Sequence, residues 1–283
     1  MKKLDALTYL IAGLVLVAAG FCLFYSTAGD PFPVVSIYGE RVELYGDGIY
    51  AYNTVLKAAA NKGTDATMVL VAILFIISTV KSKKRNKHTF YQLGFLTGLL
   101  YYASFLVFGV TFNQLFPVYL LLFSATLFTF IFLLSALIRN NNLSNMLQAV
   151  TLKGTAIFII ISGCSALVWL QFIIPALISG EPLAHMEIYT TEPTFVLDLA
   201  IILPTYLGCG IAMLNQKQIG YKLAPILLVF IIIVGLTVIS QTIFQTAMGI
   251  IIPVNEMVGL VFSFVLLGLI AFILNVRFAK YLK

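Results

Sequence analysis

The sequence predicts an all-α membrane protein built as a bundle of about eight transmembrane helices. Of its 283 residues, 61% are hydrophobic and 10% are charged, whereas a soluble domain carries about 25% charged residues to cover its surface. In lipid the backbone must satisfy its hydrogen bonds within the protein, so spanning segments are helices or closed barrels. Residues 226–234 are apolar at every position and lack the two-residue alternation of a barrel strand. Composition and pattern therefore favour helices in a bilayer.

Eight largely apolar segments are long enough to cross a bilayer as helices, and the second is the shortest. They cover residues 5–27, 66–80, 90–111, 117–138, 155–179, 194–214, 224–250 and 256–276. Met1-Lys2-Lys3 resembles the start of a signal peptide, but the apolar run from Leu7 to Tyr25 is longer than a signal core. We therefore expect this run to be the first helix of a single polytopic domain, residues 1–283.

The basic residues gather in alternate intervals between these segments. If the N-terminus is cytoplasmic, 14 of the 17 Lys and Arg residues fall on the cytoplasmic side. Three remain outside, namely Arg41, Lys57 and Lys62. The positive-inside rule predicts this bias, and a miscounted helix would have scrambled it. We therefore predict that both termini are cytoplasmic and that the outer face carries most of the acidic residues.

Charge and cysteine usage exclude several functional classes. The formal charge of +6 is spread over short clusters instead of one broad patch, so we expect no nucleic-acid partner. Cys22, Cys164 and Cys209 lie in apolar segments without C-x-x-C spacing, which favours packing over redox or metal chemistry. The sequence has no P-loop, dinucleotide fingerprint, H-E-x-x-H motif or serine elbow. We expect no cofactor and no metal, and the lipid bilayer is the first partner.

The first external interval, residues 28–65, is patterned as a structured subdomain. Two segments rich in β-branched and aromatic residues predict a small hairpin, residues 34–38 and 41–45. Gly46-Asp47-Gly48 then breaks the chain. We expect Asn53 to cap a short helix that runs to Lys62, with Gly63 as its C-terminal stop.

Asp198 is the one ionisable residue that these spans place well inside the membrane. An intramembrane carboxyl costs a few kcal/mol, which makes Asp198 a candidate contact for a ligand or a proton. It lies about five residues, or about 7 Å, below the outer end of helix six. A structural role, in which it bonds loop backbone or caps a neighbouring helix, is therefore also open.

Other candidate ligand-binding residues share the outer half of the membrane with Asp198: Gln171, Gln241, Gln245, Glu256 and Trp169. Because buried amides need partners, they predict a polar pocket that opens outside and is bordered by helices five to eight. Packing between helices is the alternative for the glutamines, and a lipid-facing or packing position is the alternative for the tryptophan. Pro175 and Pro204 would kink helices five and six near the same cluster.

The two halves of the chain share a short similarity. Residues 64–70 match residues 191–197 at five of seven positions, with Asp and Glu equated, at an offset of 127. This suggests two parallel four-helix repeats, residues 1–138 and 150–283, although similar apolar composition is the alternative. Gly94-x-x-x-Gly98 also predicts a close helix contact, either within the bundle or between protomers.

Four short motifs lie in the external loop, at the start of helix two and in helix six: Tyr45-Gly46-Asp47-Gly48-Ile49-Tyr50, Gly63-Thr64-Asp65, Val196-Leu197-Asp198-Leu199 and Leu203-Pro204. In these motifs the sequence resembles an uncharacterised family of bacterial polytopic membrane proteins. The family more often has Asp in place of Asn53 and Arg in place of Lys62. The resemblance implies a multi-pass protein of the bacterial plasma membrane whose external loop and helix-six start act together, with no known activity to transfer. In this chain, the candidate site residues of the external loop are Tyr45, Asp47, Tyr50 and Asp65.

The sequence leaves three functional hypotheses open. The first is a non-enzymatic protein that binds or passes a small molecule or lipid through the external pocket, with Asp198 as the charged contact. The second is an outer-leaflet enzyme on a lipid-linked substrate, with Asp198 or Glu256 as general base. The third is a membrane subunit that scaffolds a partner protein.

The topology gives a first testable prediction. Reporter domains fused near Lys84 and near Asp47 should lie in opposite compartments, because one span separates these positions and the basic residues mark the cytoplasmic side. Activity of paired cytoplasmic and extracytoplasmic reporters measures this. If both fusions reported the same compartment, the helix count and the external site would both be wrong.

Overall fold

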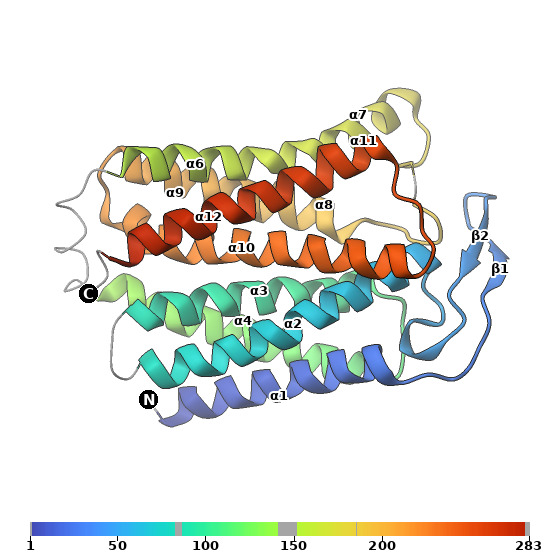
Figure 1. The fold of residues 1–283 in the computed structure, drawn as a ribbon, viewed down its shortest axis with the longest axis horizontal. Helices are drawn as coiled ribbons and strands as arrows, with labels where there is room; N and C mark the ends of the chain where they lie inside the picture. Colours follow the sequence, from blue (N-terminus) through green and yellow to red (C-terminus); the bar gives the residue numbers. More distant parts are fainter. Residues whose placement is uncertain (1, 83–86, 141–151, 185, 281–283) are drawn as a thin grey trace.

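A computed structural model describes residues 2–82, 87–140, 152–184 and 186–280. Its described residues contain eight helices that are long and apolar enough to cross a membrane, which confirms the predicted all-α bundle (Figure 1). The predicted cytoplasmic intervals 81–89 and 139–154 lie partly outside the described residues. Eight apolar spans in a chain with so few charged residues make the protein an integral, multi-pass membrane protein with lipid as its surroundings.

The first four spans are continuous helices: α1 (Lys2–Phe24), α2 (Val55–Ser82), α3 (Lys87–Gly109) and α4 (Phe116–Arg139). The fifth span joins α6 (Lys153–Cys164), the 3₁₀ helix η3 (Ser165–Trp169) and α7 (Leu170–Ser179). The sixth joins α8 (Pro193–Leu197), the π-helix η4 (Asp198–Ile202) and α9 (Leu203–Leu214). The seventh is α10 (Gln218–Ala247), and the eighth joins α11 (Val254–Glu256), the π-helix η5 (Met257–Phe262) and α12 (Ser263–Ala279).

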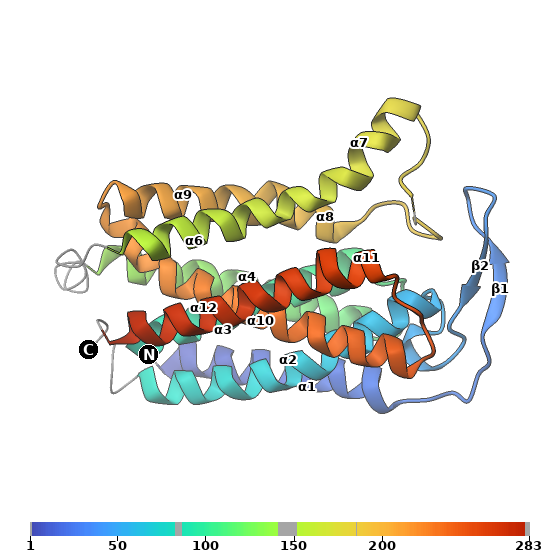
Figure 2. The ribbon, with the colours of Figure 1, turned by 45° about the horizontal axis from the view of Figure 1, so that its top comes forward.

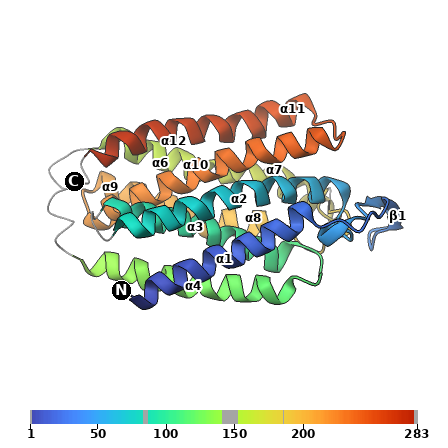
Figure 3. The same ribbon diagram turned by 60° about the horizontal axis from the view of Figure 1, so that its bottom comes forward.

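The two ends of the bundle differ in what they carry. Both chain termini lie at one end, which we call the terminal end, and a β-hairpin projects from the other, which we call the loop end (Figures 1 and 3). Strand β1 (Phe32–Val35) pairs antiparallel with β2 (Arg41–Leu44), and Val35 faces Arg41 across the pair. The predicted hairpin is therefore confirmed, although its first strand begins two residues earlier than expected.

Helix two begins at Val55, so the predicted boundary at residue 66 is wrong. The expected short helix does not stop at Gly63 but continues into the span, and the external loop ends at residue 54. The Thr54 hydroxyl accepts a hydrogen bond from the Lys57 amide at 3.4 Å, so Thr54 and not Asn53 stands at the helix start. Gly63 lies in the helix interior, where a Cβ atom would come within 2.5 Å of the Gln241 Cα atom of α10. Close packing, and not a turn, therefore requires glycine here.

The central element is α10, which packs against α2, α3, α9 and α12. Residues 226–231 of α10 are all buried, as expected for a helix that is apolar on every face. Gly94 and Gly98 of α3 lie against Val229 and Ile233 of α10, so the predicted close contact is within the chain. Gly235 meets Gly268 of α12 in the same way.

The second half of the bundle is less regular than the first. The π-helix at Asp198–Ile202 ends two residues before Pro204, whose missing amide proton removes one hydrogen bond of a regular α-helix. In the fifth span the change of helix type lies at Ser165–Trp169, before Pro175. Figure 2 shows α7 leaning away from the rest of the bundle beyond this segment. The two proposed repeats contain four spans each, and their relationship stays a prediction.

The packing of α2 on α10 gives a second prediction. Gly63→Ala should lower the free energy of unfolding by about 1–3 kcal/mol, because the new methyl group meets backbone that cannot rotate away. Gly13→Ala is the matched control, since nothing lies within 4 Å of its added Cβ atom. Thermal unfolding of purified protein in detergent measures both. Equal melting temperatures of the two variants would contradict the close contact between these helices.

Candidate functional site

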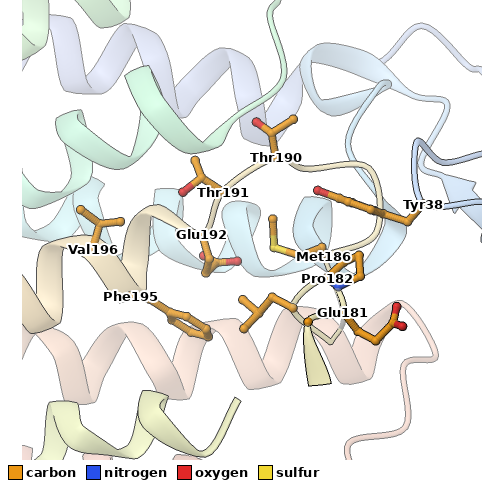
Figure 4. Close-up of a pocket in the computed structure, with 11 residues that line it drawn as sticks. Tyr38, Glu181, Pro182, Met186, Thr190, Thr191, Glu192, Phe195 and Val196 are labelled. Atoms are coloured by element: carbon orange, nitrogen blue, oxygen red, sulfur yellow. The ribbon is translucent and has the colours of Figure 1, made fainter. Parts of the chain in front are cut away.

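A cavity of about 530 Å³ opens at the loop end, at the start of helix six. Figure 4 shows the 180–193 loop around it, with Tyr38 of the hairpin turn on one side and Phe195 and Val196 of α8 on the other. The lining residues are Tyr38, Gly180, Glu181, Pro182, Leu183, Met186, Thr190, Thr191, Glu192, Phe195 and Val196. The cavity thus combines carboxylate and hydroxyl groups with an apolar floor. We call it the loop-end cavity.

Side chains of the first external loop and α2 hold the loop that forms this cavity. The Tyr38 hydroxyl donates to the Tyr189 carbonyl at 2.9 Å, and the Tyr189 hydroxyl donates to the Asn53 side-chain oxygen at 3.2 Å. The Thr54 hydroxyl donates to Glu187 Oε2 at 2.6 Å. The external loop and the start of helix six are therefore in contact, and their joint action stays a prediction.

Lys57 of α2 makes the ion pair of this region. Its Nζ atom lies 2.6 Å from Glu192 Oε2, with both side chains only 25% and 14% exposed. The same ammonium group stands 5.7 Å from the centre of the Tyr189 ring. Burial raises the pKa of the Tyr189 hydroxyl, so that it remains a neutral donor. The loop is thus fixed by charge, hydroxyl and ring contacts together.

Asp198 lies in the π-helix behind the cavity and does not line it. Tyr101 of α3 donates a hydrogen bond to its Oδ1 atom at 2.9 Å, and the Trp169 indole donates to its Oδ2 atom at 2.8 Å. Both carboxylate oxygens therefore have partners from two other helices. This arrangement fits the structural alternative for Asp198, because the carboxyl joins helices three, five and six.

Trp169 connects Asp198 to the loop-end cavity. Its ring stacks on Phe195 at a centroid distance of 4.8 Å and an interplanar angle of 22°. Phe195 also stacks with Phe172 at 5.9 Å and lines the cavity. A ligand in contact with Phe195 would therefore sit next to the single tryptophan of the chain.

Asp65 is a second carboxyl inside a span, and the prediction that Asp198 is the only one is wrong. Asp65 is fully buried in α2. It accepts hydrogen bonds from the Tyr50 hydroxyl at 2.8 Å and from the Tyr102 hydroxyl at 2.5 Å. Asp65 therefore lies inside the bundle and not in the external loop, where the sequence placed it. The placement was missed because helix two begins eleven residues before the predicted boundary.

The other external-loop candidates also have identified contacts. Tyr45 accepts a hydrogen bond from Lys62 Nζ at 3.0 Å, and the ammonium lies 4.9 Å from its ring centre. Asp47 accepts hydrogen bonds from the Ser26 hydroxyl at 2.9 Å and the Thr27 amide at 2.6 Å. Burial acts to raise the pKa of Asp47, but the hydrogen bonds from Thr27 and Ser26 outweigh it and lower the pKa. This anionic carboxylate ties the loop to the end of α1.

The remaining candidates do not line the loop-end cavity. Gln241 donates to the Thr64 hydroxyl at 2.8 Å, which matches the packing alternative for this residue. Gln171 is exposed on α7, whereas Gln245 and Glu256 are half-buried. Among the residues that the structure describes, no three His, Cys, Asp or Glu side chains are grouped to hold a metal ion.

Comparisons with known proteins add no relative. No family model matches the chain, and no curated protein or solved structure matches it either.

The buried Asp65 cluster gives a third prediction. Tyr102→Phe should lower the free energy of unfolding by about 1–3 kcal/mol, because a fully buried carboxyl loses one of its two donors. Tyr9→Phe is the control, because the Tyr9 side chain is 47% exposed on α1, and it should change stability by less than about 0.5 kcal/mol. Thermal unfolding compares the variants. A Tyr102→Phe protein as stable as Tyr9→Phe would show that the bond adds nothing.

Proposed function

We propose that this membrane protein binds a small molecule or lipid in the loop-end cavity without transforming it. The observation that carries the proposal is the cavity itself, because contacts with the first external loop and with α2 fix the 180–193 loop that forms its walls. A volume of about 530 Å³ falls within the range of small-molecule sites, about 300–1,000 Å³. Apolar and polar lining groups together suit an amphiphilic ligand.

The position of the cavity supports access from the membrane. Helix six begins at Pro193, so Phe195 and Val196 lie in its first turn, close to the membrane boundary. Val196 is 55% exposed and Ile201, further along the same span, is 54% exposed. The tail of an amphiphile could lie along these side chains while its head occupies the cavity.

Catalysis and conduction receive less support than binding. A general base must reach its substrate, but the Asp198 oxygens both accept hydrogen bonds from Tyr101 and Trp169. Asp65 is enclosed in the same way by Tyr50 and Tyr102. Residues 226–231 of the central helix are apolar and buried, which provides no polar groups for a path toward the terminal end.

We further propose that the protein lies in a bacterial plasma membrane with its terminal end in the cytoplasm. The bias of basic residues supports this orientation, and the family resemblance supports the bacterial setting. The cavity would then open on the outer face.

A cavity-filling substitution tests the proposed binding. Thr191→Phe places a larger side chain on the cavity lining, and it should remove most of the small molecules or lipids that co-purify with the protein. Ile251→Phe is the control, because Ile251 is 91% exposed at the same end and does not line the cavity. Native mass spectrometry counts the bound species on wild type and both variants. Equal occupancy of all three proteins, with equal melting temperatures, would reject the cavity as a binding site.

A further inference from the structure

We infer that the ligand of the loop-end cavity is an amphiphile with a cationic head group, an inference that rests on the proposed binding function. The lining contains two carboxylates, Glu181 and Glu192, and three hydroxyl groups, those of Tyr38, Thr190 and Thr191. No lysine, arginine or described histidine belongs to it. Glu192 is already paired with Lys57, so Glu181 supplies the carboxylate charge that a ligand would meet. This charge would repel a phosphate or sulfate head and attract an ammonium head.

The chain itself shows how this loop holds a cation. The Lys57 ammonium, next to the cavity, lies against the Glu192 carboxylate at 2.6 Å and over the Tyr189 ring at 5.7 Å. A carboxylate combined with an aromatic face is the arrangement that binds ammonium groups elsewhere in proteins. The cavity lining also contains a carboxylate, that of Glu181, and an aromatic ring, that of Tyr38. Glu181 is exposed and makes no ion pair with the described residues, so its charge is open to a ligand.

The overall charge of the loop end also favours a cationic ligand. Acidic residues in its loops and helix ends outnumber the basic ones: Asp30, Glu40, Glu43, Asp47, Glu181, Glu187, Glu192 and Glu256. Of the basic side chains there, Lys57 is paired with Glu192 and Lys62 is bound to Tyr45. A surface with this balance concentrates cations near the cavity and repels anions.

The apolar side chains of the lining would contact the alkyl tail of such an amphiphile. Leu183, Met186, Phe195 and Val196 form one part of the cavity wall, and Val196 leads to the lipid-exposed side of helix six. A single alkyl chain could follow this side chain into the bilayer. The predicted ligand therefore joins an amine or quaternary ammonium head to an alkyl tail.

Trp169 provides the readout for a test, because it is the single tryptophan and stacks on Phe195 of the lining. We would titrate the intact protein, in micelles of the uncharged detergent dodecyl maltoside, with three probes that have the same octyl tail: octyltrimethylammonium, octyl sulfate and octyl glucoside. Octyltrimethylammonium should change Trp169 emission at the lowest concentration, and octyl sulfate at the highest. Added salt should weaken the ammonium response, since the attraction is between charges near water.

Three substitutions distinguish the proposed cationic preference from the proposed binding function. Glu181→Gln should weaken octyltrimethylammonium binding about fivefold and leave octyl glucoside unchanged. Glu43→Gln, an exposed carboxyl outside this lining, is the matched control and should change neither. Thr191→Phe should abolish the response to every probe.

The outcomes have distinct meanings. If octyl glucoside bound as tightly as octyltrimethylammonium and Thr191→Phe blocked both, the cationic preference would be wrong and the binding function would stand. Tighter binding of octyl sulfate, or equal effects of Glu181→Gln and Glu43→Gln, would also overturn the preference. If Thr191→Phe responded like wild type to all three probes, the cavity would not be the site and both proposals would fall.

Discussion

Two consecutive tyrosines of α3, Tyr101 and Tyr102, donate hydrogen bonds to the carboxyl groups of Asp198 and Asp65. These bonds connect helices two, three and six in the half of the bundle nearer the loop end. Successive residues of an α-helix point about 100° apart, so Tyr101 and Tyr102 reach different neighbours. Tyr102 donates to Asp65 of helix two, and Tyr101 donates to Asp198 of helix six. Because water is scarce at this depth, each carboxyl must find its donors in the protein. One short segment of α3 therefore joins the first and second halves of the chain.

The loop contacts extend this arrangement beyond the membrane. Tyr50 of the first external loop is the second donor to Asp65, so the buried carboxyl also fixes the loop. Burial raises the pKa of Tyr50, which keeps its hydroxyl a neutral donor. Asn53 and Thr54, a few residues further, hold the 180–193 loop through Tyr189 and Glu187. A continuous set of hydrogen bonds thus runs from α3 to the wall of the loop-end cavity.

The sequence predicted the eight spans because span formation depends on composition and length, which each segment carries by itself. It did not predict the start of helix two. Residues 58–65 contain an asparagine, a lysine, a glycine and an aspartate, and their helix is stabilised by burial against other spans, including α10. The partners of Asp65 and Asp198 lie 15 to 97 residues away in sequence, so no local pattern indicates them. Tyr101-Tyr102 within a predicted span was the signal that could have suggested donors for buried carboxyls.

The cavity could not be predicted for a related reason, since its shape depends on a loop backbone fixed by distant side chains. Glu187 adopts a left-handed backbone conformation with φ of 54°, which is uncommon for a residue other than glycine and costs about 1 kcal/mol or more. The hydrogen bond from Thr54 to its carboxylate holds it there, and Lys57 fixes Glu192 five residues later. The wall of the cavity is therefore set before a ligand arrives. A site fixed in this way would lose little conformational entropy on binding the proposed ligand.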